Sequence, residues 1–244
     1  MTVSAGATPP PPGMTPERIG FFTDAVFAIA MTLLVIEIPR PEGVEFALGD
    51  GVSKLRAAEN LGHFLRAQAS SFYACLLAFM LLWLVWRRHH ELLDSVDRVS
   101  PRVVAWHFPL LLLAAFLPYP TTVVGHYAGN PLAAAFYGLT VGCLLACRAV
   151  LEQLAYDERA LRPHADRVRI RRNLMVARIA TGYWMLSLLL VWWAPWIQIA
   201  WFLTFAVWFA ANAVLRRSMA THGYADVGHP SAVVGPARHP TNNH

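Results

Sequence analysis

The chain has 244 residues, of which 56% are hydrophobic and 14% are charged, and its formal net charge is +5. Because soluble domains carry about 25% charged residues, this composition excludes an ordinary soluble domain and indicates an integral membrane protein. The basic residues lie in short stretches beside apolar segments, so the positive charge indicates membrane topology and no nucleic-acid partner.

Six apolar segments are long enough to cross a hydrocarbon core of roughly 30 Å, since a helix rises about 1.5 Å per residue. They are predicted at 19–38, 66–86, 103–123, 131–151, 173–193 and 196–215. The first loop, 39–65, is expected to contain a short amphipathic helix. Helix ends or kinks are expected at Pro39, Pro109, Pro118, Pro120, Pro131 and Pro195. The predicted fold is an all-α membrane protein with six transmembrane helices at 17–217, between disordered tails at 1–16 and 218–244.

The distribution of lysine and arginine predicts the orientation of the chain in the membrane. Loop 87–102 contains four arginines and loop 152–172 contains six, whereas the opposite side has only Arg40, Lys54 and Arg56, with Arg66 at the edge of a span. Loops rich in lysine and arginine stay in the cytoplasm. Both termini are therefore expected to be cytoplasmic, which agrees with an even number of spans.

The first span carries an aspartate, Asp24, near its start, although a carboxylate in a membrane costs about 2.5–3.5 kcal/mol. Arg18 is six residues away, too far for a direct pair along one helix face, so each residue is expected to find partners on other helices. The candidate partners are His89, His90 and His107. The structural interpretation is a polar clamp that joins three helices; the functional interpretation is a proton relay or a gating latch.

A stripe of residues follows Asp24 at spacings that place them on one helix face: Ala25, Ile29, Thr32 and Ile36. Around a symmetric axis such a stripe forms stacked rings, in which apolar rings gate by dewetting and hydroxyl oxygens face a partly dehydrated cation. The alternative is ordinary packing, with the Thr32 hydroxyl bonded to the carbonyl of Ala28.

The fourth span carries small residues at a spacing of four: Ala134, Gly138, Gly142 and Ala146. Small residues in one stripe let two helix backbones approach closely. This face is predicted to pack against another helix and to carry no chemistry.

The first span and three later motifs resemble the transmembrane protein 175 family. The matching stretches are Arg18-x-x-x-Phe22-Thr23-Asp24 with its apolar continuation, Ser71-Phe72, Trp86-x-x-His89-His90 and Leu117-Pro118-Tyr119-Pro120-Thr121. The resemblance covers roughly 16–127, and the last three spans match in number and spacing.

This resemblance implies a potassium channel with six helices per repeat, and a chain with one repeat implies a homotetramer in the cytoplasmic membrane of a prokaryote. The first helix of each subunit would line the pore, with Ile29, Thr32 and Ile36 at the constriction. Potassium is then the permeant ion and no cofactor is implied. The residues expected to form the polar clamp are Arg18, Phe22, Thr23, Asp24, Trp86, His89 and His107.

Two positions depart from the family pattern. Thr23 replaces a serine and keeps the hydroxyl, whereas His107 replaces an asparagine and makes the expected clamp titratable. A proton channel or proton-coupled transporter is the main alternative, but the outer half of the first span offers only Glu37. An enzyme is not predicted, because the sequence shows no metal-ligand cluster, no nucleophile paired with a base and no phosphate-binding loop.

Overall fold

The computed structural model describes residues 15–46, 53–96, 99–157, 161, 166–193 and 196–223. Its elements, in chain order, are α1 (Pro16–Ile36), η1 (Val44–Phe46), α2 (Lys54–Ala67), α3 (Ala69–Ser95), α4 (Pro101–Phe116), α5 (Pro118–His126), α6 (Pro131–Asp157), α7 (Arg167–Ser187), η2 (Leu188–Leu190) and α8 (Trp196–Gly223). Within the described residues every named element is therefore helical. Most of the two tails expected to be disordered, 1–14 and 224–244, lies outside these residues.

Six segments are long and apolar enough to cross a membrane, which confirms the predicted number. Several helices continue past the predicted ends of their apolar segments. Helix α3 runs on to Ser95, α6 to Asp157 and α8 to Gly223, the last beyond the boundary predicted at 217. The added stretches are rich in leucine, alanine, glutamate and arginine, which are strong helix formers in water as well as in a membrane.

The third span is divided at Leu117 into α4 and α5. Pro118 and Pro120 lack the backbone N–H groups that would continue the hydrogen-bond ladder, which explains the break. The chain resumes its helical course at once, since Thr121 N donates to the carbonyl oxygen of Leu117 at 3.1 Å. The proline cluster therefore kinks the span as predicted and does not end it.

Polar side chains begin several of the helices. Ser53, Ser100 and Asp166 each accept a hydrogen bond from a backbone N–H in the first turn of α2, α4 and α7. Asn130 Oδ1 accepts from the N–H groups of the residues after Pro131, at the start of α6. These caps satisfy donors that the first turn of a helix leaves without a partner.

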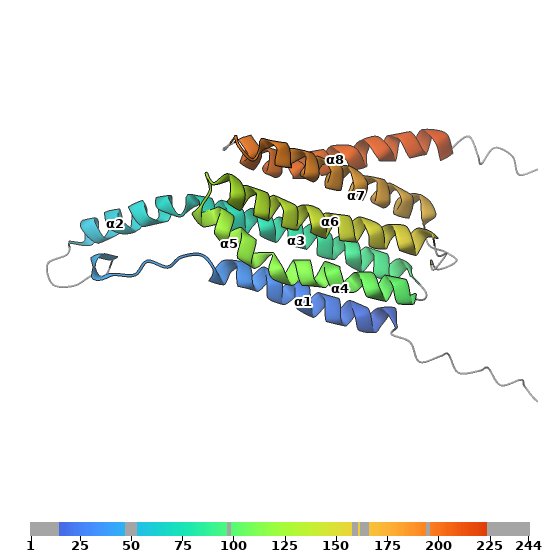
Figure 1. Cartoon of the computed structure of the whole chain (residues 1–244), viewed down its shortest axis with the longest axis horizontal. Coiled ribbons are helices and arrows are strands. Elements are labelled where there is room, and N and C mark those ends of the chain that lie inside the picture. The colour runs from blue at the N-terminus through green and yellow to red at the C-terminus, as the bar shows by residue number, and fades with distance from the viewer. Residues whose placement is uncertain are drawn as a thin grey trace, which may run out of the picture.

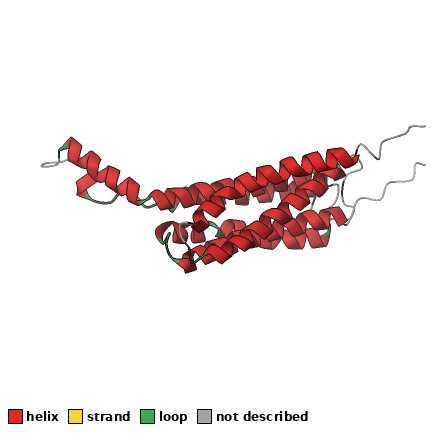
Figure 2. Cartoon of the chain, turned by 90° about the horizontal axis from the view of Figure 1, so that it is seen from above, coloured by secondary structure: helices red, strands yellow, loops and turns green. Residues whose placement is uncertain are grey.

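The bundle is built around α3 and α6, as Figure 1 shows. Helix α1 packs against α3, α4 and α5 on one side, and α7 packs between α6 and α8 on the other. The first residues of α1 and the last residues of α8 lie at the same end of the bundle (Figure 1). The amphipathic helix predicted in the first loop is α2, which projects beyond the opposite end (Figure 2).

The predicted stripe of small residues on α6 is a packing surface against α7 and α8. Gly138 and Gly142 are buried, and the indole Nε1 of Trp184 donates to the carbonyl oxygen of Gly138 at 2.8 Å. A Cβ atom at Gly138 would lie 2.5 Å from Leu188 Cδ2 and 3.3 Å from Trp201 Cζ2. A side chain at this position would therefore require Leu188 to move and Trp201 to give way.

Replacing Gly138 with leucine is expected to destabilise the protein by about 1–3 kcal/mol, because it forces bulk into a filled contact. The readout is the melting temperature of the purified protein, from size-exclusion profiles after heating. Gly182 on α7 is the matched control, since a Cβ there meets no atom within 4 Å. If Gly138→Leu melts at the temperature of Gly182→Leu, the close packing is not required.

Candidate functional site

Helix α1 has two unlike faces. One face is buried against the rest of the subunit and consists of Ile19, Thr23, Phe27, Ala30 and Leu34. The other is exposed: Ile29 and Ile36 keep 59% and 58% of their surface, and Thr32 is also exposed. The stripe predicted from spacing therefore lies opposite the buried face and takes no part in packing within the subunit.

The hydroxyl of Thr32 donates a hydrogen bond to the carbonyl oxygen of Ile29 at 2.8 Å. The packing alternative had this hydroxyl bonded to the carbonyl of Ala28, but the side chain takes the carbonyl of Ile29, three residues back. This contact uses the hydroxyl proton and leaves the lone pairs of Oγ1 on the exposed face. The exposed stripe thus presents an oxygen acceptor between two apolar side chains.

Asp24 is attached to α3. The indole Nε1 of Trp86 donates to Asp24 Oδ1 at 2.7 Å, and His90 Nδ1 lies 3.8 Å from the same oxygen. The indole contact is a hydrogen bond to a charged group, whereas the imidazole is beyond hydrogen-bond distance. His90 also lies 3.9 Å from Asp94 on its own helix. The carboxylate near the start of α1 is therefore fastened to the last turns of α3.

His89, which was expected near Asp24, instead packs against His107 on α4. The ring centroids are 4.9 Å apart in an edge-to-face arrangement, and the two residues are 2% and 4% exposed. Nδ1 of His107 lies 2.6 Å from the carbonyl oxygen of Val103, and the other ring nitrogens have no hydrogen-bond partner in the described part of the chain. The expected clamp is thus divided into two separate contacts, one from α3 to α1 and one from α3 to α4.

Arg18 lies outside both contacts. It is exposed and makes no hydrogen bond or ion pair with any described residue, and Phe22 beside it is 64% exposed. Thr23 is fully buried, with no partner for its hydroxyl among the described residues. Six residues along a helix place Arg18 about 120° away from Asp24 around the axis. The two ends of the motif therefore face different neighbours, and the expectation that Arg18 joins the clamp is wrong within one subunit.

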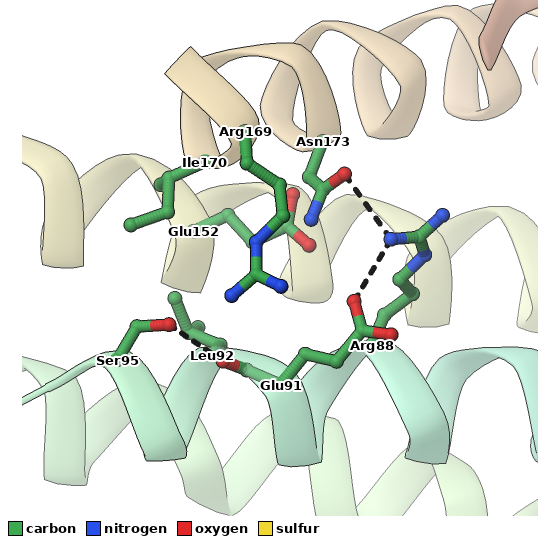
Figure 3. A pocket seen from close by; sticks show the side chains of 8 residues that line it. All are labelled: Arg88, Glu91, Leu92, Ser95, Glu152, Arg169, Ile170 and Asn173. Atoms are coloured by element: carbon green, nitrogen blue, oxygen red, sulfur yellow. Dashed lines mark hydrogen bonds and ion pairs between the residues drawn. The ribbon is translucent and has the colours of Figure 1, made fainter. Parts of the chain in front are cut away.

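A second polar cluster ties α3, α7 and α8 together at the same end of the bundle. Arg88 on α3 donates to Glu91 at 2.9 Å and to Asn173 of α7 at 3.1 Å, as Figure 3 shows. Its guanidinium also lies 5.1 Å from the ring centroid of Trp208 on α8, a cation–π distance. One buried arginine on α3 therefore contacts both α7 and α8.

Arg148 and Glu152 form a buried ion pair on α6. Arg148 Nη2 lies 2.7 Å from Glu152 Oε1, and the two side chains are 3% and 4% exposed. Sequence analysis missed this pair because Glu152 was assigned to the loop after a predicted span. The signal was present in the four-residue spacing of opposite charges at the end of an apolar run. Among the described residues, no group of three or more histidine, cysteine, aspartate or glutamate side chains is arranged to hold a metal ion.

The fold is that of a helical-bundle membrane protein, with six helices long and apolar enough to cross a membrane. The first of them carries an exposed apolar stripe and an aspartate that is bonded to α3. Residues 18–118 match the family described as "Endosomal/lysosomal potassium channel TMEM175". A Streptomyces collinus protein named as a potassium channel is 32% identical over 164 residues, which are 63% of this chain and 74% of that one. A Chamaesiphon minutus protein, also named as a potassium channel, is 29% identical over 200 residues, which are 80% of this chain and 94% of that one.

Two solved structures share the fold. One is the crystal structure of a lysosomal potassium-selective channel TMEM175 homolog from Chamaesiphon minutus, with a TM-score of 0.61 and 24% identity; the match covers 83% of this chain and 97% of that one. The other is a variant of the potassium channel MtTMEM175 bound to a nanobody fusion, with a TM-score of 0.54 and 18% identity over 86% of this chain and 95% of that one. These two structures show the shared fold; the family match and the 32% identical relative show that the chain belongs to the TMEM175 family.

Replacing Trp86 with phenylalanine removes the indole donor to Asp24 and keeps most of the packing. Hydrogen bonds to charged groups contribute about 1.5–3 kcal/mol, and the 37% exposure of the Asp24 side chain places this one near the lower end. The expected result is a loss of about 1.5 kcal/mol in the free energy of unfolding. Trp83→Phe is the control, because Trp83 makes no hydrogen bond within the described ranges. Equal losses for both variants would show that the Asp24 contact contributes nothing to stability.

Replacing Glu152 with alanine leaves the Arg148 guanidinium buried without its counter-ion. The expected cost is about 3–5 kcal/mol, measured as a lower melting temperature or a loss of folded protein. The double variant Arg148→Met, Glu152→Leu removes both charges and is expected to recover most of that loss. A Glu152→Ala protein as stable as the original would refute a structural role for the ion pair.

Proposed function

We propose that this protein is a potassium-permeable cation channel that conducts passively as a homotetramer in a prokaryotic cytoplasmic membrane. Family membership and the two relatives named as potassium channels support the permeant ion. The exposed apolar stripe of α1 is the observation that carries the pore. Within the described ranges no metal site accompanies it, and the proposal assigns the protein no cofactor and no enzymatic step.

Helix α1 is the proposed pore lining. It is less enclosed than the spans it packs against. In the most apolar stretch of α1, 28% of the residues are buried, against 44% in the span formed by α3 and 44% in the span formed by α4 and α5. The side opposite its packing face requires another environment, which is lipid, a second subunit or a central pore. A helix that packs on α3 and α4 and presents Ile29, Thr32 and Ile36 outward has the geometry that a symmetric assembly needs to surround an axis.

The proposed constriction consists of three stacked rings, each formed by one residue from four subunits. Ile29, Thr32 and Ile36 span seven residues, or about 10 Å along the helix axis. Apolar rings admit a cation only after it sheds part of its hydration shell, and a narrow apolar ring also closes by dewetting. Potassium loses water at a lower free-energy cost than sodium, so a ring of isoleucines favours potassium.

Thr32 has a defined part in this proposal. Its hydroxyl proton is bonded to the carbonyl oxygen of Ile29, so the oxygen lone pairs face outward between the two isoleucine rings. Four such oxygens would replace part of the water that the ion loses on passing the apolar rings. The contact of Asp24 with Trp86 would hold the start of the pore helix against α3.

The distribution of arginine supports cytoplasmic termini. The start of α1 and the end of α8 lie at the same end of the bundle as the last turns of α3 and the first turn of α7. These turns contain Arg87, Arg88, Arg167 and Arg169. Segments beside a span that are rich in arginine remain in the cytoplasm. In this orientation the motif from Arg18 to Asp24 faces the cytoplasmic mouth of the pore. The projecting helix α2 then lies on the opposite side of the membrane.

Replacing Ile29 with asparagine is expected to raise sodium permeability and weaken discrimination, because a polar ring removes part of the dehydration cost. The measurement is the reversal potential of the purified protein in planar bilayers, with potassium on one side and sodium on the other. The original protein is expected to reverse near the potassium equilibrium potential, and the variant closer to zero.

Val35→Asn is the matched control, since Val35 is 61% exposed on α1 but lies about a quarter-turn away from the stripe. Its permeability ratio is expected to equal that of the original protein. Unchanged ratios in Ile29→Asn would overturn the assignment of the constriction. An absence of current together with dissipation of a pH gradient in liposomes would replace the potassium channel with a proton pathway.

A further inference from the structure

Helix α7 carries three exposed arginines on one narrow face. Arg167, Arg171 and Arg178 are spaced by four and seven residues, which places them within about 40° of one another around the helix axis. The segment 166–178 contains five arginines and one acidic residue. This face of α7 is therefore strongly positive.

Arg178 lies at a depth where a charge is costly. It is twelve residues before Leu190, the end of the apolar span, or about 18 Å into a hydrocarbon core of roughly 30 Å. Its Nη2 donates to Oε1 of Gln153 on α6 at 2.7 Å. Gln153 follows Pro131, the start of α6, by about 33 Å of helix, so it lies near the arginine-rich end of the bundle. The side chain of Arg178 therefore extends from the hydrocarbon towards that surface, as long basic side chains do.

The subunit gives Arg178 a hydrogen bond but no counter-ion. The bond to Gln153 uses one of the several N–H donors of the guanidinium. The amide of Gln153 in turn donates to Asp157 and so stands between the arginine and that carboxylate. Within the described residues, Arg167, Arg171 and Arg178 form no ion pair with an aspartate or glutamate. The positive face is thus open to an anion from outside the subunit.

The same side of α7 becomes apolar beyond Arg178. Gly182, Leu186 and Leu189 follow it, and all three are exposed. A Cβ atom at Gly182 would meet no atom within 4 Å, so the helix leaves open space beside its backbone there. From Arg171 to Gly182 the helix rises about 16 Å, close to the thickness of one leaflet of the hydrocarbon core, about 15 Å. The arrangement suits an amphiphile, with positive charge at the surface and an apolar track towards the midplane.

Helix α7 lies on the side of the subunit away from α1. Helix α1 packs against α3, α4 and α5, whereas α7 packs between α6 and α8, as Figure 1 shows. In the proposed assembly α1 surrounds the axis, which places α7 at the perimeter. The exposed face of α7 then meets lipid, and in this respect the site rests on the proposed function.

We infer that this face of α7 binds an anionic phospholipid of the leaflet at the arginine-rich end. Its phosphate lies between Arg171 and Arg178, and one acyl chain runs along Gly182. A guanidinium binds phosphate through parallel hydrogen bonds, and basic side chains at the membrane surface attract anionic lipid. The phosphate supplies the counter-ion that the subunit does not, which offsets the cost of placing Arg178 in the hydrocarbon.

Native mass spectrometry of the purified protein tests the head-group contact. The protein is equilibrated with palmitoyl-oleoyl phosphatidylglycerol or with the phosphatidylcholine of the same chains, and the lipid retained per subunit is counted. The original protein is expected to prefer phosphatidylglycerol, and Arg178→Gln to lower that preference about fivefold. Arg169→Gln is the matched control, because Arg169 carries the same charge on α7 but faces the pocket that Glu91 and Glu152 also line (Figure 3). It is expected to leave the preference unchanged.

A variant that fills the apolar track tests the acyl chain separately. Gly182→Phe is expected to reduce retention of both lipids, whereas Leu139→Phe, at an exposed apolar position on α6, is expected to have no effect. Equal retention of phosphatidylglycerol by the original protein and Arg178→Gln would overturn the inference. So would a loss of the oligomer in Arg178→Gln with lipid retention unchanged, since a carboxylate of a second copy would then be the counter-ion.

The two proposals fail in different measurements. The same spectra give the number of subunits, and the reversal potential in planar bilayers is measured without reference to lipid retention. A tetramer that selects potassium but does not prefer phosphatidylglycerol contradicts the lipid site alone. A monomer that retains phosphatidylglycerol through Arg178 contradicts the proposed assembly and supports the lipid site.

Discussion

The structure depends on the fact that α1 buries only one of its faces within its own subunit. In hydrocarbon the helix satisfies its own backbone groups, so only its side chains decide what lies beside it. Phe27, Ala30 and Leu34 pack inward, and the opposite side presents Ile29 and Ile36. A subunit built this way is incomplete with respect to its first helix, and the proposed assembly around a central axis follows from that incompleteness.

Polar contacts are concentrated at the end of the bundle where α1 begins. Asp24 meets Trp86 there, His89 meets His107, and Arg88 contacts α7 and α8. The first contact joins α1 to α3, the second joins α4, and the third joins α7 and α8, so α3 is the common support for both halves of the subunit. A buried polar group without a partner is costly, so the contacts of Asp24 with Trp86 and of Arg88 with Asn173 favour this arrangement of helices.

The stripe proposed to line the pore is formed by Ile29, Thr32 and Ile36. It is apolar with one hydroxyl oxygen, which suits the partial dehydration of a cation.

The sequence by itself determined the number of spans, the amphipathic helix in the first loop, the kink at Pro118 and the packing role of Gly138. Each of these depends on local chemistry: apolar length, proline without its N–H, and glycine without a side chain. The pattern along α1 also predicted which residues share a face.

Only the tertiary structure decided which side chains meet. It brought Asp24 beside Trp86 and His90 and not beside His89, left Arg18 exposed, and brought Arg88 against α7 and α8. It also placed Arg178 of α7 beside Gln153 of α6. Neighbouring residues such as His89 and His90 point about 100° apart on a helix, so their partners depend on how the helices are rotated and packed, and spacing along one chain does not specify that rotation.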